Sequence, residues 1–308
     1  MRGCDMRRSN PLVGTQTKST ERKKLVEAAS LVRARAEKGD VKAQFDLASM
    51  YYYGKGMPQN YAEALRWSRK AADQGHAQAQ GALGSMYYDG KGVPQDYAEA
   101  ARWYRKASDQ GSAKAQFALA SIYYDGKGVP QDYAEAARWY LKAAEQGDAL
   151  AQLNLGFMYH QGKGVPQDYT EAILWYRKAA YQGNAEAEYN LGYMYYYGQG
   201  LPQDYTDARR WYRKAADHGY PEAQRALRSI ERKSRIATRI RYLVLFIAFF
   251  EGLVFSLGFL WPGRSFRNSR HATLLGVIAL SYAGLSLYGI IHDDILYAEM
   301  RSIWPKGC

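Results

Sequence analysis

Pairs of acidic side chains three residues apart recur along this chain, and Asp96 with Glu99 is a clear example. Two neighbouring carboxylates can serve as the general acid and general base of an enzyme. No histidine, lysine or metal-ligating partner recurs beside them, and each pair stands where a helix should begin. There the first residue can accept from first-turn amides and the second completes a capping box. We therefore interpret the pairs as helix caps; the others are Asp132/Glu135, Asp168/Glu171, Asp204/Asp207 and Asn60/Glu63.

A Gly-x-Gly pair also recurs, and such a turn can bind phosphate when it follows a β-strand. Here each pair, such as Gly90 and Gly92, follows a predicted helix, so we interpret it as a connector. The five histidines fall at different phases of the repeat, and the two cysteines, Cys4 and Cys308, are terminal. No catalytic constellation and no cysteine zinc site can be assembled from these residues. We predict no enzyme activity, no cofactor and no metal.

The elements that position these residues repeat every 36 residues. The sequence from Tyr87 to Ala107 returns at Tyr123 to Ala143 with a single difference. Five full units span 39–218, and a partial sixth begins at residue 219. Each unit predicts two helices, such as 77–88 and 96–111, joined by the Gly-x-Gly connector. A fixed period of about 20 to 50 residues is typical of a solenoid, whose units bury their apolar faces by stacking.

The repeated pattern A-x-x-x-L-G-x-M-Y-Y-x-G-x-G-V-P-Q-D-Y-x-x-A-x-x-W-Y-x-K-A-A stands at 79–108, with Ser108 in the final position. It resembles the Sel1-like repeat, a relative of the tetratricopeptide repeat, and the resemblance covers residues 39–235. The resemblance implies an all-α, right-handed α/α solenoid that acts as an adaptor or scaffold for other proteins, without catalysis of its own. It names no partner.

A net charge of +12 suggests a nucleic-acid partner, but the distribution of this charge along the chain argues against one. Residues 39–218 hold twenty basic and twenty acidic residues, so the five units are neutral. The excess of basic over acidic residues lies in residues 1–38 and 219–241. A solenoid that binds a nucleic-acid backbone should instead carry its basic residues on the repeats, where they can contact the phosphates. We therefore expect no nucleic-acid partner. Residues 1–18 are predicted to be a disordered basic tail, and residues 19–38 to form a helical cap on a solenoid that spans 19–235.

Two apolar stretches follow the solenoid, at 242–261 and 273–291, with a short tail at 292–308. Each is about twenty residues long, which as a helix matches the roughly 30 Å core of a bilayer. We predict two transmembrane helices; a buried hairpin that caps the solenoid is the alternative. Seven basic residues flank the pair and three lie in its loop, so both termini and the solenoid are expected on the cytoplasmic side of the inner membrane. The basic stretch 232–241 should attract anionic lipid.

Glu251 interrupts the first apolar stretch. A central acid costs about 3 kcal/mol on insertion scales, and the thirteen Leu, Ile, Val and Phe residues of this stretch outweigh it at about 0.3 to 0.6 kcal/mol each. In an antiparallel hairpin Glu251 would lie at the depth of Ser281 and Tyr282. Its role is either structural, in assembly, or in the movement of ions or protons.

Helix A, the first helix of each unit, has one face that hardly changes between units and one that varies. Turned by about 100° per residue, the two sets of positions fall on opposite arcs. The constant arc should be core, and the resemblance places the varying arc on the concave face, where it would form an aromatic groove for a peptide or a partner helix. The alternative is that some rings, Phe45 and Phe117 above all, pack on the preceding helix B. This predicted stripe comprises Phe45, Ser49, Tyr52, Ser85, Tyr88, Phe117, Ser121, Tyr124, Leu153, Asn154, Phe157, His160, Tyr189, Asn190, Tyr193 and Tyr196.

Together these features predict a membrane-anchored adaptor, in which a cytoplasmic solenoid binds a partner protein and a two-helix hairpin holds it at the bilayer. In the alternative function the hairpin, with Glu251, is the working part of a transporter, channel or membrane enzyme complex. The solenoid would then be its regulator.

Overall fold

The computed structural model describes residues 11–260 of the chain. Two compact units divide it, residues 1–220 and residues 221–308, and each is described by itself. Within the described residues there are twelve α-helices and no β-strand. The predicted all-α class is confirmed for this part of the chain.

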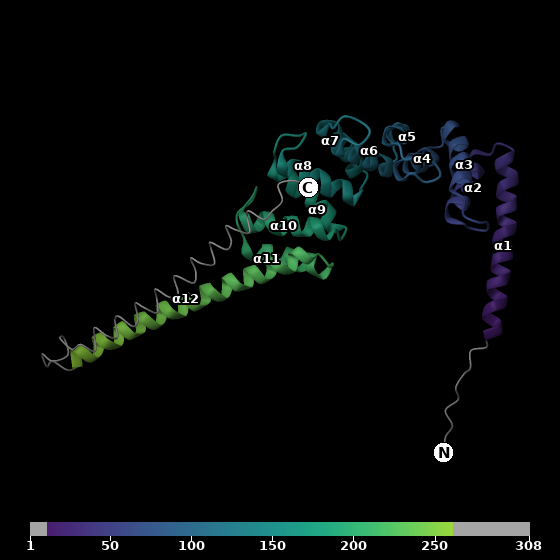
Figure 1. The fold of residues 1–308 in the computed structure, drawn as a ribbon. Helices are drawn as coiled ribbons and strands as arrows, with labels where there is room; N and C mark the ends of the chain where they lie inside the picture. The colour runs from purple at the N-terminus through teal and green to yellow at the C-terminus, as the bar shows by residue number, and fades with distance from the viewer. Residues whose placement is uncertain (1–10, 261–308) are drawn as a thin grey trace, which may run out of the picture. The chain divides into compact units, whose positions relative to one another are not determined.

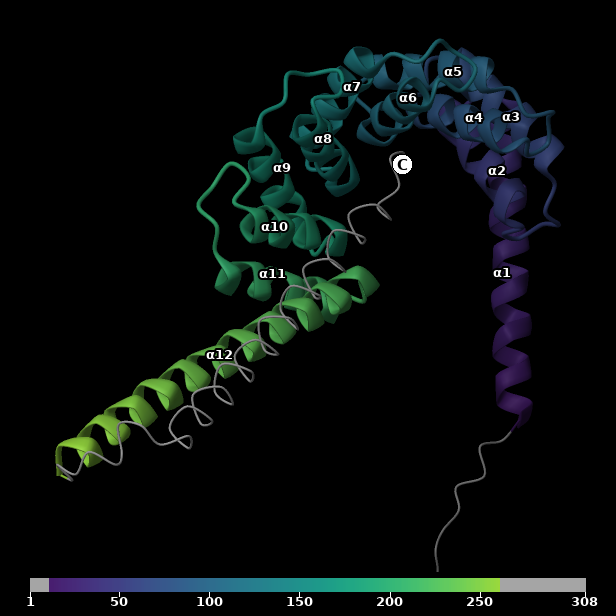
Figure 2. The ribbon, with the colours of Figure 1, turned by 60° about the vertical axis from the view of Figure 1, so that its left-hand side comes forward.

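Ten helices of equal length build the solenoid, and they follow one another in chain order along a curved array (Figures 1 and 2). We call α2/α3 to α10/α11 repeats 1 to 5, with the even-numbered helix as helix A and the odd-numbered helix as helix B. Each helix packs on the next one along the chain. The helices are α2 Val41–Tyr53, α3 Tyr61–Asp73, α4 Ala77–Asp89, α5 Tyr97–Asp109, α6 Ala113–Asp125, α7 Tyr133–Glu145, α8 Ala149–Gln161, α9 Tyr169–Tyr181, α10 Ala185–Tyr197 and α11 Tyr205–Asp217.

The predicted acid pairs do begin the B helices. The Asp96 carboxylate accepts from the backbone N–H of Glu99 at 2.9 Å, and the same cap recurs at the start of every helix B. The reciprocal half of the predicted capping box is wrong. The backbone N–H of Asp96 donates to the carbonyl of Tyr87 at 3.0 Å, and the Glu99 carboxylate accepts from the indole of Trp103 at 2.9 Å. In repeats 2 and 3 the carboxylate of the second acid is therefore bound by an indole side chain and does not cap the helix.

Each helix A ends at a glycine in the left-handed conformation, as the connectors predicted. Gly90, at φ +70°, donates its N–H to the carbonyl of Met86, and this geometry recurs at the end of every helix A. The core consists of alanine, aliphatic and aromatic residues, such as Ala107, Leu119 and Trp139, all of which are buried. The alanines let neighbouring helices approach closely, and the buried rings fill the space between them.

A ladder of glutamine pairs, each with one buried and one exposed member, runs along the repeats. Gln116 donates to the carbonyl of Ser108 at 3.2 Å and accepts at 2.7 Å from Gln146, which lies thirty residues further along. Equivalent bonds to the glutamine thirty residues ahead are made by Gln44, Gln80 and Gln152. In the last rung Glu188 replaces glutamine and His218 is its partner at 2.8 Å. Because each buried amide has a partner, this polar ladder is compatible with burial and fixes the register between repeats.

The first helix, α1, runs Pro11–Glu37 and thus begins ahead of the predicted cap at residue 19. Its residues Val32 and Ala36 pack with Leu47 and Trp67 of repeat 1. Residues 1–10, the beginning of the predicted disordered tail, lie outside the described part of the chain.

The second unit contains α12, Pro221–Leu260, a single helix of 40 residues. The sequence suggested a partial sixth repeat to residue 235 and a separate helix from 242, but α12 runs through both. The reason is local: Ser234 stands where the other A helices have their terminating glycine, and neither glycine nor proline occurs between Pro221 and Gly252.

Within the described residues, no helix has both the length and the apolar character needed to cross a membrane. The backbone of Glu251 belongs to α12. The predicted second span at 273–291, with Ser281 and Tyr282, and the tail at 292–308 lie outside the described residues. The membrane hairpin therefore stays a prediction.

Candidate functional site: the helix A stripe and the contacts between repeats

The stripe tyrosine near the end of helix A, predicted to line the groove, contacts the next repeat in repeats 1 to 3. Tyr124 lies edge-on against Tyr133 of helix B at 5.1 Å, and its hydroxyl accepts from the ammonium of Lys163 at 3.1 Å. Lys163 belongs to the connector of the following repeat, 39 residues away. The hydroxyls of Tyr52 and Tyr88 accept in the same way from Lys91 and Lys127, at 2.8 and 3.2 Å. These tyrosines hold successive repeats together.

In repeat 4 a different pair of side chains makes the contact that tyrosine and lysine make in repeats 1 to 3. His160 replaces the tyrosine and Gln199 replaces the lysine, and the imidazole Nε2 lies 2.8 Å from the Gln199 carbonyl oxygen. Burial lowers the pKa of His160, because a charged imidazolium is less well solvated there. In repeat 5 the equivalent ring is Tyr196, which is buried and lies edge-on against Tyr205.

The stripe side chains nearest the start of helix A pack against the core rather than line a groove. Leu153 and Tyr189 are buried, and Tyr189 packs between Tyr212 and Tyr220 at 5.3 and 5.1 Å. Phe117 packs on Tyr140, which belongs to the following helix B and not to the preceding one as the alternative supposed. Phe45 is half-buried and lies 5.0 Å from the His76 ring.

The middle of the stripe changes character along the solenoid. Repeats 1 to 3 have Ser49, Ser85 and Ser121 at a position where repeats 4 and 5 have Phe157 and Tyr193. Phe157 and Tyr193 are half-buried, as are Asn154 and Asn190 beside them. Most of the sixteen stripe side chains thus contact other residues of the solenoid. The rings that remain partly open at this position lie in repeats 4 and 5.

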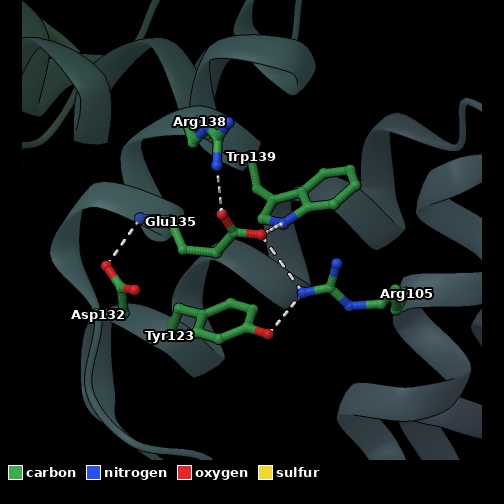
Figure 3. A network of polar contacts seen from close by, with 6 residues as sticks. All are labelled: Arg105, Tyr123, Asp132, Glu135, Arg138 and Trp139. Carbon is green, nitrogen blue, oxygen red and sulfur yellow. Dashed lines mark hydrogen bonds and ion pairs between the residues drawn. The ribbon is translucent and has the colours of Figure 1, made fainter.

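A network of polar contacts that the sequence did not predict joins repeats 2 and 3 (Figure 3). Arg105 of α5 donates to the Tyr123 hydroxyl at 2.6 Å and to the Glu135 carboxylate at 3.3 Å, and its guanidinium lies 5.6 Å from the Trp139 ring centre. The indole N–H of Trp139 donates to the same carboxylate oxygen at 2.9 Å, and Arg138 pairs with the other oxygen at 3.1 Å. An arginine 30 residues before the acid in four of the five repeats is the signal that could have revealed this network.

Glu135 is a structural carboxylate, as its surroundings show. Partial burial acts to raise its pKa, but the hydrogen bonds from Trp139, Arg138 and Arg105 outweigh burial and lower it. A carboxylate held ionised between three donors is poorly suited to accept a proton in catalysis. Among residues 11–260, no group of three or more His, Cys, Asp or Glu residues is placed to hold a metal ion.

Pairs of equal helices that stack in register, each repeat bonded to the next through tyrosine, glutamine and arginine side chains, define an α/α solenoid of the scaffold type. The sequence matches the Sel1 repeat at 41–76, 77–112, 113–148, 149–184 and 185–220. The chain belongs to the Sel1 repeat family. Such a solenoid fits a scaffold for protein–protein interaction, and Sel1 repeat proteins bind protein partners and generally have no enzyme activity of their own.

Solved structures agree with this assignment. A protective antigen of uropathogenic Escherichia coli strains, which displays an SLR fold, is 39% identical with a TM-score of 0.64; the match covers 66% of this chain and 43% of that one. A Sel1 repeat protein from Oxalobacter formigenes is 35% identical with a TM-score of 0.61, over 70% of this chain and 85% of its own. Comparison with the curated proteins gives no match.

Proposed function

We propose that this Sel1 repeat protein is an adaptor that binds a partner protein through repeats 4 and 5 and is held at a membrane by its C-terminal apolar segments. The observation that carries the proposal is the change along the stripe, where Phe157 and Tyr193 replace the serines of the earlier repeats. Both rings are half-buried, so each is fixed by its neighbours while part of its surface stays open. Fixed aromatic side chains are the residues that most often dominate a protein interface.

The start of the first apolar stretch supports the membrane part of the proposal. Tyr242, Val244, Leu245 and Phe246 of α12 are between 58% and 69% exposed. So many large apolar side chains in sequence are costly in water and are stabilised by lipid or by another protein. The basic residues before them would then lie at the surface of an anionic bilayer and orient the solenoid toward the cytoplasm.

Two measurements on the full-length chain test this function. Alkaline carbonate should leave the chain in the membrane pellet, whereas Leu245→Glu with Phe246→Glu should release it; release of the unaltered chain would refute anchoring. A photo-crosslinking residue at 157 or 193 should capture a discrete protein in intact cells, and the same residue at 49, the matching position in repeat 1, should not. Equal capture at 49 would refute the location of the partner surface. Loss of a membrane activity in Glu251→Gln, with capture intact, would favour the alternative function.

A further inference from the structure

Repeat 4 lacks both of the arginines that pair with the equivalent acid, Glu135, in repeat 3. In the other repeats the first-turn acid of helix B forms an ion pair with an arginine three residues on; these pairs are Glu63–Arg66, Glu99–Arg102, Glu135–Arg138 and Asp207–Arg210. Repeat 4 has Leu174 at this position, 45% exposed. The arginine that arrives from the preceding repeat is also missing, because Leu141 stands at the position of Arg105. Within residues 11–260 the Glu171 carboxylate has no hydrogen bond and no ion pair.

The preceding junction shows which group these residues are built to hold. There Arg105 places its guanidinium between a tyrosine hydroxyl, a carboxylate and the face of an indole (Figure 3). One repeat earlier, Arg69 lies in the same way on Trp103 and bonds the hydroxyl of Tyr87. A guanidinium suits this site because it is flat, carries charge and has several N–H donors in one plane.

Repeat 4 has the same three side-chain types that contact Arg105 in repeat 3: a tyrosine, a glutamate and a tryptophan. Tyr159, Glu171 and Trp175 each lie 36 residues after the side chains that hold Arg105. Burial, together with the negative charges of Glu171 and Asp168, raises the pKa of Tyr159, so its hydroxyl stays neutral and available to accept a hydrogen bond. The hydroxyl has no hydrogen bond within the described residues. The site therefore lacks only the arginine. Lys178 lies 3.7 Å from the Trp175 ring centre, as Lys142 lies 4.1 Å from that of Trp139 in the site that also holds Arg105.

Trp175 also has a buried hydrogen-bond donor that differs from its counterparts in repeats 2 and 3. Its side chain is buried, with 6% exposed, yet its indole N–H has no hydrogen-bond partner. In repeats 2 and 3, where an arginine lies on the ring, the equivalent N–H donates to the glutamate at 2.9 Å. The N–H of Trp67 in repeat 1 also lacks a partner. There Arg33 of α1 stands at the position of Arg69 and contacts Tyr51 rather than Trp67, and Arg66 lies 5.2 Å from the Trp67 ring centre.

An apolar cavity of about 290 Å³ opens beside Tyr159 and Leu141. Its lining is completed by Ala134, Ala137, Arg138, Leu155, Gly164 and Val165. The matching cavity at the preceding junction, about 260 Å³, has Arg105 in its wall where this one has Leu141. The substitution thus both removes the internal arginine and makes the neighbouring surface apolar.

We propose that Tyr159, Glu171 and Trp175 form a docking site for an arginine side chain of a partner protein, with an adjacent apolar residue of that partner in the cavity beside Leu141. The arginine would donate to the Tyr159 hydroxyl and the Glu171 carboxylate and lie on the Trp175 ring, as Arg105 does one repeat earlier. This inference rests on the proposed function and specifies the chemistry of its partner.

The test uses the purified full-length chain and the tripeptide acetyl-Leu-Arg-Leu-amide as the probe. Titration should shift the NMR signal of the Trp175 indole N–H, assigned with Trp175→Phe. The tripeptide with citrulline in place of arginine, which keeps the shape but not the charge, should bind at least tenfold more weakly. Glu171→Gln should weaken the arginine probe to a similar degree, with unchanged circular dichroism.

Two reciprocal substitutions sharpen the test. Leu141→Arg should fill the site from within and weaken the probe at least tenfold, and it should fold well because it restores the residue of the preceding repeat. Arg105→Leu should create a second probe site, reported by the indole of Trp139. The proposal is wrong if the probe leaves the Trp175 signal unmoved, if Leu141→Arg binds as the unaltered chain does, or if Arg105→Leu gains no site. Any of these results leaves the adaptor function standing, because that function is tested by membrane extraction and by crosslinking at 157 and 193.

Discussion

Replacing Gly164 with alanine should weaken the junction between repeats 3 and 4 more than any loss of a side-chain contact there. Gly164 has φ +70°, and a Cβ atom on it would lie 2.2 Å from the carbonyl oxygen of Tyr133 and 2.7 Å from the backbone nitrogen of Ala134. Both atoms belong to the first turn of helix α7 in the preceding repeat. These backbone atoms belong to a regular helix and cannot shift as a flexible side chain would. The connector that carries the added Cβ must therefore move away from α7.

The magnitude follows from two separate costs. The left-handed conformation costs an alanine about 1 to 2 kcal/mol. Overpacking against a fixed neighbour costs about 1 to 3 kcal/mol more. Gly147 offers a matched control, since it has φ +93° and its added Cβ would meet nothing within 4 Å. We therefore expect Gly164→Ala to lower the free energy of unfolding by about 2 to 5 kcal/mol, and Gly147→Ala by only about 1 to 2 kcal/mol.

Urea unfolding of the full-length chain, followed by tryptophan fluorescence, measures both variants. Hydrogen exchange should also show lost protection first in the helices that flank the junction, because solenoid stability depends on contacts between neighbouring repeats. Gly128 and Gly111 form a second pair of the same kind in the preceding repeat, with the Gly128 Cβ at 2.4 Å from the backbone of Ala98. Equal losses for the members of each pair would refute the steric reasoning and leave only the backbone conformation.

Three further substitutions test other parts of the solenoid. Gly81→Ala in α4, where the added Cβ meets nothing within 4 Å, should stabilise the chain by up to about 1 kcal/mol in urea unfolding; destabilisation would show a contact that the structure lacks. Gln116→Leu removes two hydrogen bonds, the one donated to the Ser108 carbonyl and the one accepted from Gln146, while the Ser108 carbonyl keeps its bond from the Gly111 N–H. At about 0.5 to 1.5 kcal/mol for each lost bond it should cost about 1 to 3 kcal/mol, and a neutral result would mean that the ladder is dispensable. Burial lowers the pKa of His160 in the folded chain, so its contribution to stability is complete above about pH 6.5 and declines as the pH falls through that value. Thermal unfolding between pH 7.5 and 5 should show this decline, and His160→Tyr with Gln199→Lys, which restores the pair of the earlier repeats, should reduce it; an unchanged pH dependence would contradict the assignment.

The caps and connectors were predictable because they depend on residues close together in the chain. Asp96 accepts from an amide three residues away, and Gly90 ends helix α4 through a bond to Met86 four residues back. The same local reasoning also explains an error. Glu99 at the third helical position suits a capping box, but the Trp103 indole one turn further along competes for its carboxylate and takes it.

The predicted stripe shows what reasoning from neighbouring residues could not predict. Helical periodicity separated the varying face of helix A from the constant one, but it could not tell which varying rings stay open. That outcome depends on partners 18 to 39 residues away, such as Lys163 at the hydroxyl of Tyr124 and Tyr140 beside Phe117. The polar network of Arg105 was missed for the same reason, since its acceptors lie on the two following helices.

The sequence by itself determined the all-α class, the repeat length, the helix starts and the connectors, because each follows from short-range hydrogen bonds and from a pattern that recurs five times. Only the tertiary structure decided how the repeats are joined. The glutamine ladder joins the two helices of one repeat through Gln116 and Gln146 and reaches the preceding repeat through the Ser108 carbonyl. The tyrosine–lysine contacts and the arginine networks link side chains 18 to 39 residues apart in successive repeats, and all these partners are fixed by how one helix packs on the next. Nothing in the sequence marks Leu141 and Glu171 as parts of a site. The proposed arginine site is recognised only because the structure shows how Arg105 is bound in the repeat before.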